Sequence, residues 1–486
     1  MKKCENTGSF TLGDWTARVL ACHARESAKG LLPSGEGIAS APRAVQSIVK
    51  LFALVFLFAL AATAQAVQRD NSVSLLYLDP QSGMTADAAV ALALENNGEL
   101  QALLKEVDAA RALVKQARLR PNPQLNAAGA NQIGGPDNNQ MAEIMLPLEL
   151  GGRRRARVAV AQRELEAREF ELENQERLLA SEVRLKFGEA LAAIKKLEVA
   201  EKTLTAAKQG YDLVAARVTD GKIAPLEQNI FLVEVNRLQS IRESSEGKVE
   251  IAMFELRNMI GMKPEDPLRL RGDFVGLIAP QPPLSESTEN ALRDRPDLEG
   301  ARAVERLAAA KIEQATSEGR LDASIKSGYQ RMNSSFPVSG FNENGVLRPV
   351  QSVFRFFTFG VEINLPVRNR NQGAVEAAKF DREAAVRRIE FGELTIRREV
   401  AVAFARYTRA ARALSIFQSG VRDQASANLQ VIWQTYELGS RSLLDYIAEE
   451  RRFLDVENAL VDAELETYIA NIEIMRAVNS PELRKK

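Results

Sequence analysis

Two short stretches of the chain alternate apolar and polar residues with the period of a β-strand. The stronger one covers residues 357–365 and the weaker one residues 142–146. One apolar face over about ten residues is typical of strands that cross the bacterial outer membrane. Each stretch is predicted to be the second strand of a β-hairpin. The apolar positions are Phe357, Phe359, Val361, Ile363 and Leu365 in the stronger stretch and Ala142, Ile144 and Leu146 in the weaker one, while Glu143 and Glu362 lie on the polar phase.

The regions that follow the two hairpins have the composition and spacing of long helices. No proline occurs between Pro147 and Pro225 or between Pro366 and Pro481, and both regions are rich in Ala, Glu, Arg and Leu, which favour helices. In the first region apolar residues recur in steps of seven, four and three, the spacing of a coiled-coil seam. A single helix over residues 152–220 would be about 100 Å long at about 1.5 Å per residue. This length predicts a rod that crosses an aqueous space.

Each predicted rod ends at a glycine and returns as a second helix. The first turns at Gly221, and Pro225 opens a helix that runs to about Gly261. The second turns at Gly439, and its return runs to about Val478. Glycine just beyond a helix end and proline in the first turn of the next helix are the expected placements.

The elements occur twice in the same order, which predicts a tandem repeat. Pro147 and Pro366 are 219 positions apart, and Gly221 and Gly439 are 218 apart. About 21 extra residues are predicted in the second hairpin, mostly within 332–350. The predicted fold is mainly α with a small β part. Its parts are an N-terminal extension (1–47), a signal peptide (48–66), a first repeat (84–263), a proline-rich linker (264–284), a second repeat (285–480) and a tail (481–486).

The segment before the repeats has the pattern of a secretory signal. Residues 51–62 are apolar, Arg43 and Lys50 precede them, and Ala64-Gln65-Ala66 follows as a small-x-small cleavage pattern. The apolar run is shorter than the ~20 residues that a helix needs to span a bilayer. We expect cleavage after Ala66, with a buried core helix as the alternative. Residues 1–47 are either a mispredicted start or an N-terminal extension.

Cleavage after Ala66 would change the chemistry that the chain can support. Both cysteines, Cys4 and Cys22, and the one histidine, His23, precede the cleavage site. The mature chain would have no disulfide, thiolate, His base or Cys lipid anchor. Its 57 basic and 60 acidic residues give no basic surface for nucleic acid. No phosphate-loop, His-Glu-x-x-His or Gly-x-Ser-x-Gly motif occurs. No enzyme activity, cofactor or metal site is therefore predicted, and the many carboxylates are interpreted as ion pairs on helix faces.

Four strands in one chain cannot close a barrel. An open sheet would leave unpaired backbone groups at its edges in lipid, whereas three chains would supply twelve strands. We therefore expect a homotrimer with one shared barrel in contact with outer-membrane lipid. The alternative is that the hairpins cap a non-conducting periplasmic coiled-coil scaffold or adaptor, although a scaffold gives no reason for the alternation after Phe357.

The repeat resembles the TolC-like outer-membrane factors over about residues 84–478. The motifs that carry the resemblance are Leu119-Arg120-Pro121-Asn122-Pro123, the strand exit from Leu146 to Arg155, and the run from Tyr436 to Asp445. They are most similar to the heavy-metal branch of CzcC-like and CusC-like proteins. The resemblance implies a trimeric outer-membrane efflux channel with a twelve-stranded barrel and an α-helical periplasmic tunnel. It also implies a periplasmic adaptor and an inner-membrane pump, of the RND type, as partners. The cargo stays open between metal ions, drugs, dyes and polypeptides, with metal cations favoured.

The second turn carries the residues that the resemblance implies for a gate. In the family a Tyr, an Arg and an Asp at this turn keep the tunnel closed, and the matching residues are Tyr436, Arg441 and Asp445. A carboxylate that follows in relatives is replaced here by Ala448. The alternative is that Asp445 only caps a helix. The two turns together form the predicted adaptor-docking tips, represented by Arg217, Gly221, Gly439 and Ser440.

The predicted barrel supplies the remaining candidates. Glu143 and Glu362 would form a lumen ring of six carboxylates in a trimer, which favours cations; the alternative is an unselective wet interior. The cluster of Phe354, Phe356, Phe357 and Phe359, with Ile363, is interpreted as a membrane girdle. Arg153-Arg154-Arg155 is interpreted as a basic collar at headgroup level rather than as a phosphate site.

Overall fold

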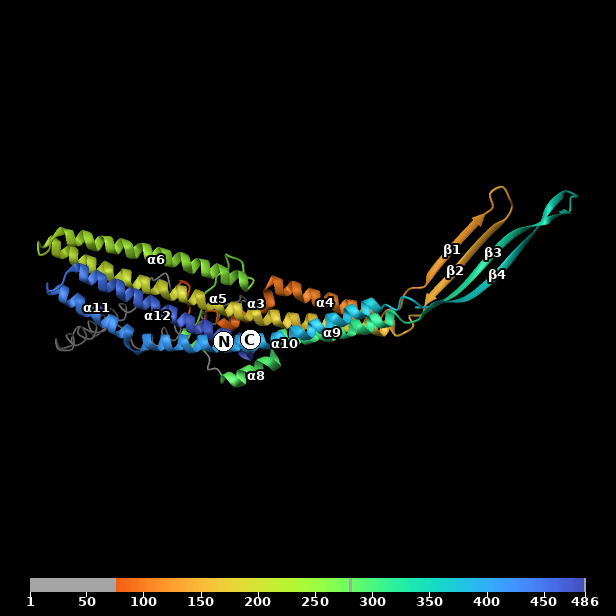
Figure 1. The fold of residues 1–486 in the computed structure, drawn as a ribbon. Coiled ribbons are helices and arrows are strands. Elements are labelled where there is room, and N and C mark those ends of the chain that lie inside the picture. The colour runs from red at the N-terminus through yellow and green to blue at the C-terminus, as the bar shows by residue number, and fades with distance from the viewer. Residues whose placement is uncertain (1–75, 279–281, 485–486) are drawn as a thin grey trace, which may run out of the picture. The chain divides into compact units, whose positions relative to one another are not determined.

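The computed structural model describes residues 76–278 and 282–484. The predicted signal peptide and N-terminal extension lie outside the described residues. Within the unit Ser72–Lys486, long helices lead into one small sheet. The strands extend beyond one end of the helices, and the turns that join α5 to α6 and α11 to α12 lie at the other end (Figure 1). None of the described helices is both long enough and apolar enough to cross a membrane.

Two consecutive halves contain the same order of elements. Each half has two shorter helices, a β-hairpin, a long helix and a return. In the first half these are α3 (Ala86–Asn96), α4 (Gly98–Arg118), β1 (Gln124–Asn131), β2 (Asn138–Pro147), α5 (Arg153–Thr219) and α6 (Pro225–Met259). In the second half they are α8 (Leu284–Asp294), α9 (Pro296–Glu318), β3 (Asp322–Phe341), β4 (Leu347–Asn364), α10 (Gln372–Ile416), α11 (Arg422–Glu437) and α12 (Leu443–Val478).

Helix α5 is the predicted rod. Its 67 residues make it about 100 Å long at about 1.5 Å per residue. Gly152, with a φ of 85°, turns the chain into the helix. Gly221, with a φ of 70°, turns it out again, and Pro225 is the first residue of α6. A positive φ favours glycine because it has no Cβ to clash with the backbone.

The second rod differs from the prediction because it is interrupted. A π-helical turn, Phe417–Val421, separates α10 from α11. Within it Gly420 has a φ of 141° and a ψ of −13°, which is not a helical conformation. The absence of proline could not reveal this break, since a single glycine is compatible with a helix and with a bulge.

The strands form one antiparallel sheet in the order β1-β2-β3-β4. The second hairpin is longer, with strands of 20 and 18 residues against 8 and 10 in the first. A register shift lies between Ser335 and Ser339 of β3. Both β1 and β4 are edge strands, so one side of each has no partner within the described chain.

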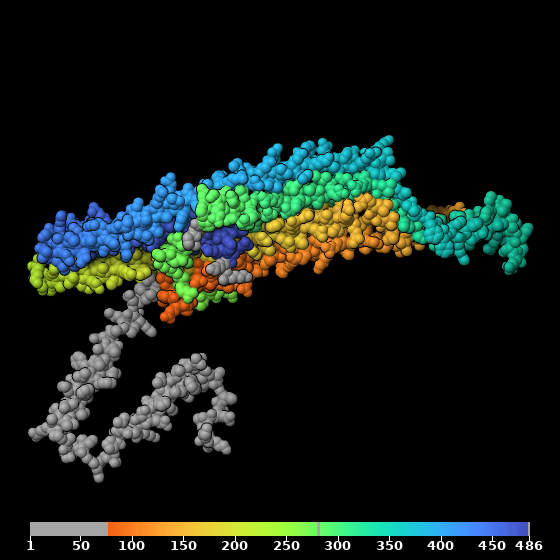
Figure 2. Space-filling view, turned by 90° about the horizontal axis from the view of Figure 1, so that it is seen from below, coloured from red at the N-terminus to blue at the C-terminus, as the bar shows by residue number. Residues whose placement is uncertain are grey.

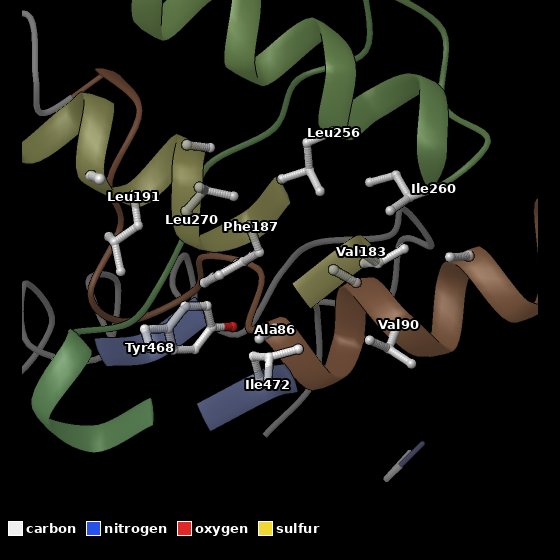
Figure 3. Close-up of a cluster of buried hydrophobic side chains, with 14 of the residues drawn as sticks. Ala86, Val90, Val183, Phe187, Leu191, Leu256, Ile260, Leu270, Tyr468 and Ile472 are labelled. Atoms are coloured by element: carbon white, nitrogen blue, oxygen red, sulfur yellow. The ribbon is translucent and has the colours of Figure 1, made fainter. Parts of the chain in front are cut away.

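Three apolar clusters hold the helices together. The largest includes Phe187 of α5, Leu256 of α6 and Tyr468 of α12, all with at most 1% exposure (Figure 3). Leu270, from the segment predicted as a proline-rich linker, is buried in the same cluster, and its backbone pairs with Leu78 and Met84. The segment 264–284 is therefore packed against the helices for part of its length, including the short helix α7 (Phe274–Leu277). Figure 2 shows α9 and α10 of the second half along one long side of the unit and α4 and α6 of the first half along the other.

Gly188 lets α12 approach α5 closely. A Cβ at Gly188 would lie 2.4 Å from a ring carbon of Tyr468, whose hydroxyl donates a 3.0 Å hydrogen bond to the Arg184 carbonyl. We expect Gly188→Ala to lower the unfolding free energy by about 1 to 3 kcal/mol, because the core would be overpacked. Thermal unfolding of the purified chain measures this. The control is Gly247→Ala in α6, where nothing lies within 4 Å of the added Cβ. This control should raise the unfolding free energy by up to about 1 kcal/mol, because alanine favours a helix more than glycine does. A Gly188→Ala variant as stable as this control would contradict the packing.

Candidate functional site

One face of the sheet is an apolar belt. Phe357 and Phe359, which were predicted to form a girdle with Ile363, are 76% and 81% exposed, and Ile363 is 51% exposed. The strand register places Phe357 opposite Tyr329 and Phe359 opposite Ser327, and directly opposite residues share a face. The rings of Tyr329 and Phe357 are 5.4 Å apart. Other exposed apolar residues of this face are Ile144, Leu146, Ile325 and Val361.

The apolar belt does not include Phe354 and Phe356, which were predicted to belong to the girdle. Because successive side chains of a strand point to opposite faces, these two residues lie on the face that carries Thr358 and Glu362 rather than beside Phe357. Their rings stack with centroids 6.2 Å apart. The cluster read as one girdle in the sequence is therefore divided between the two faces of the sheet.

The polar face brings the two predicted lumen carboxylates toward a lysine that the sequence analysis missed. Lys326 of β3 lies directly between Met145 of β2 and Gly360 of β4. Its ammonium forms an ion pair with Glu362. Glu143 is on the same face, opposite Gly328. The local signal for Lys326 is its place on the polar phase of β3, directly after the apolar Ile325.

Two arginines of the predicted basic collar contact other protein groups at the junction of the strands and the helices. Arg153 donates to the Glu318 carbonyl at 2.9 Å and pairs with Asp322 at 2.9 Å. Arg154 donates to the carbonyl of Arg118, at the end of α4, at 2.8 Å. These guanidiniums satisfy carbonyl groups left open at helix ends, which explains two of the three arginines without a lipid headgroup.

At the opposite end, the structure connects the tips of the two halves. The Tyr436 hydroxyl of α11 donates a 3.0 Å hydrogen bond to Glu227 of α6. Burial, followed by this bond, raises the pKa of Tyr436 to about 12. Arg217, at the end of α5, lies 4.0 Å from Glu437 of α11. Both contacts join the first half to the second, and Glu227 and Glu437 were missed because nothing local in the sequence marks them.

The other two predicted gate residues lie beside the same tip. Asp445 and Ser442 form a capping box at the start of α12, and the Asp445 pKa is lowered by its hydrogen bonds with the backbone and hydroxyl of Ser442 and, more weakly, by the Arg441 charge. Arg441 is exposed. The structure therefore gives Asp445 a capping contact and joins Tyr436 to Glu227. Gly221, Gly439 and Ser440, which were predicted to dock an adaptor, lie in the exposed turns of this end.

A buried charge cluster lies behind the tip, and no sequence pattern predicted it. Glu234 of α6 is 1% exposed and accepts hydrogen bonds from Arg237 at 2.8 Å and from Arg451 of α12 at 2.7 Å. Burial alone would raise the Glu234 pKa, but these two arginines lower it. Glu450 of α12 is 2% exposed; burial, and then the charge of Glu234, raises its pKa to about 7. One Glu450 oxygen has no hydrogen-bond partner.

The described residues do not assemble a metal cluster, since no three Asp, Glu, His or Cys side chains among them could hold an ion. The described part of the chain has a two-faced sheet, long helices, and contacts between the two halves at the tip. A small two-faced sheet at one end of long paired helices is the architecture predicted for an outer-membrane efflux protein. The chain belongs to the outer membrane efflux protein family, whose model matches residues 89–260 and 288–480, so the resemblance predicted from the sequence is confirmed.

Known relatives include metal-resistance proteins. The cobalt-zinc-cadmium resistance protein CzcC of Cupriavidus metallidurans is 23% identical over 84% of this chain and 94% of its own length. The nickel-cobalt-cadmium resistance protein NccC of Alcaligenes xylosoxydans xylosoxydans is 25% identical over 58% of this chain and 61% of its own. A crystal structure of CusC aligns with a TM-score of 0.67 and 22% identity over 85% of this chain and 95% of that one. The mainly helical fold with a small antiparallel sheet is thereby confirmed.

Proposed function

We propose that three copies of this chain close a twelve-stranded barrel in the outer membrane and join their rods into a periplasmic tunnel. The observation that carries the proposal is the sheet itself, which has an exposed apolar face and two edge strands, β1 and β4. If β4 of one copy pairs with β1 of the next, all three sheets lose their edges, as lipid requires. The channel is then a passive exit duct.

The duct would serve a tripartite efflux system. A periplasmic adaptor of an inner-membrane pump, which we infer to be of the RND type, would dock on the tips around Arg217, Gly221, Gly439 and Ser440. The tip is the free end of the rods, far from the strands (Figure 1). We also propose that Tyr436, Arg441 and Asp445 belong to the gate, together with the partner Glu227. Metal cations are the favoured cargo, because two relatives are named for metal resistance.

Fractionation tests the proposed location and assembly. Cells that express the full chain should yield it in outer membranes, as a trimer that detergent extracts and that boiling separates into single chains. A periplasmic protein that stays soluble and monomeric would contradict the proposal and would favour a coiled-coil scaffold. An intermediate result, such as a trimer without membrane association, would also contradict it.

Ion selectivity tests the lumen face. We expect Glu143→Gln with Glu362→Gln to lower the preference for cations over anions, since six carboxylates would be lost from a trimer. Lys326→Gln should have the opposite effect, because it removes the positive charge paired with Glu362. Reversal potentials in a planar bilayer with a salt gradient measure both. Thr358→Val, on the same face, is the control because it changes no charge. If the charge variants all keep the ion selectivity of the unchanged channel, the interior is unselective.

A further inference from the structure

Two arginines lie on the same face as the apolar belt, on the side of the belt away from the helices. Arg331 of β3 and Arg355 of β4 are directly opposite each other, two residues beyond the pair of Tyr329 and Phe357. Directly opposite residues share a face, and residues two apart along a strand lie on one face. Both arginines therefore stand above Phe357 on the belt side, and Gln140 of β2 completes their row.

This arginine pair has no counter-charge in the described part of the chain. Like charges directly opposite each other destabilise a strand pair. The ion pairs of the sheet use Lys326 with Glu362 and Arg153 with Asp322, and none of those described includes Arg331 or Arg355. The nearby acid Asp137 is engaged elsewhere, because it accepts hydrogen bonds from the backbone and hydroxyl of Ser335 at 2.8 and 2.6 Å. An external anion would relieve the repulsion.

The position of the arginine pair along the strands matches the border between the apolar layer of a membrane and the lipid headgroups. Leu365 directly follows β4, at the end of the sheet nearest the helices, and its position in the alternation is that of the belt residues. It is 62% exposed and lies ten positions from Arg355. At about 3.4 Å per residue and a strand tilt of about 40°, this separation is about 25 Å along the barrel axis. Apolar bands of outer-membrane barrels are about 25 Å tall and are bordered by aromatic residues. Tyr329 and Phe357 supply that border immediately below the arginines.

We propose that Arg331 and Arg355 bind the phosphate of a lipid headgroup in the outer leaflet. The inference rests on the proposed function, which places the belt in lipid and the hairpin turns outside the cell. Paired guanidiniums match phosphate oxygens in charge and in geometry. A trimer would present three such sites, one on each copy of the sheet, and the lipid would neutralise a repulsion that the protein alone leaves in place.

Native mass spectrometry of the detergent-solubilised chain, with bisphosphorylated lipid A as the added probe, tests the site. We expect Arg331→Gln with Arg355→Gln to retain about tenfold less lipid than the unchanged chain, since each basic residue near an anionic lipid contributes to binding. Arg331→Lys with Arg355→Lys should retain an intermediate amount. The control is Arg397→Gln with Arg398→Gln, an equal loss of charge on exposed positions of α10, and it should retain lipid normally.

Several outcomes would contradict the lipid site, and one would contradict the proposed channel. Equal retention by the Gln variant, or equal retention of dephosphorylated lipid A, would overturn the site. If the chain retains inorganic phosphate alone as well as it retains lipid A, the result would also overturn the lipid site in favour of a free-anion site. Trimer formation and conductance in phosphatidylcholine bilayers are measured on the same samples. Their absence would contradict the proposed channel, whereas a conducting trimer that ignores the lipid phosphate would contradict only this inference.

Discussion

Removing the contacts that join the two halves at the tip is expected to raise single-channel conductance severalfold. The test variant combines Tyr436→Phe with Arg217→Gln, which keeps the packing of the buried ring but removes its hydrogen bond to Glu227 and the pairing with Glu437. A hydrogen bond to a charged group contributes about 1.5 to 3 kcal/mol, and an exposed ion pair contributes about 1 kcal/mol or less. Summed over three copies, the loss is about 5 to 12 kcal/mol, enough to convert a mostly closed population into a mostly open one.

Conductance in a planar bilayer measures this effect. Two further variants show whether the effect comes from the tip and whether Arg441 contributes to it. Tyr407→Phe with Arg409→Gln makes the same chemical changes in α10, away from the tip, and should leave conductance unchanged. Arg441→Ser tests the remaining gate assignment separately, because Arg441 is exposed and its described influence is on the charge of Asp445. If the tip variant conducts like the unchanged channel, the contacts between halves do not hold the closed state.

The second large effect concerns pH and the buried Glu450. Its pKa is raised from 4.5 to about 7, so the folded chain keeps this proton over a range in which the unfolded chain has released it. The unfolding free energy should therefore fall as pH rises from about 4.5 to about 7 and stay low above that range. The full shift corresponds to roughly 3 kcal/mol. The groups that face Glu450 are Glu234 and Arg237 from α6 and Tyr446 and Arg451 from α12.

Glu450→Gln should remove this part of the pH dependence and make the tip more stable at pH 8 than in the unchanged chain. The melting temperature of the solubilised protein between pH 5 and pH 8 measures it. Glu449→Gln is the matched control, since Glu449 is adjacent but forms an ion pair with the exposed Arg452 at 3.1 Å. Parallel curves for the Glu450 variant and the unchanged chain would show that Glu450 does not carry the effect.

The sequence predicted the features that depend on local periodicity. Alternation after Phe357 identified the apolar face, and proline-free stretches with glycine turns identified α5, α6 and α12 within a few residues of their ends. These signals are local, because each residue's phase or propensity is set by its near neighbours. The family followed from the same motifs and is confirmed by the match over both halves.

The features that the sequence did not predict depend on partners far along the chain. Glu227 is 209 residues from Tyr436, and Glu234 is 217 residues from Arg451, so no local pattern joins them. Phe354 and Phe356 were grouped with the girdle because four aromatic residues lie close in sequence, whereas the period of a strand separates them. Gly420 carried no distinctive local signal, although its backbone conformation interrupts the second rod.

Cysteine cross-linking between the edge strands tests the central claim that three copies close one barrel. The cysteines of the sequence, Cys4 and Cys22, both precede the predicted cleavage site, so introduced cysteines report without competition. Leu125→Cys in β1 is combined in turn with Phe357→Cys, Phe359→Cys or Val361→Cys in β4, all on the belt face. We predict that oxidation of outer membranes gives at least one variant a series of covalent products that ends at three chains. Products that end at two chains, or the absence of any product in all three variants, would contradict the shared barrel.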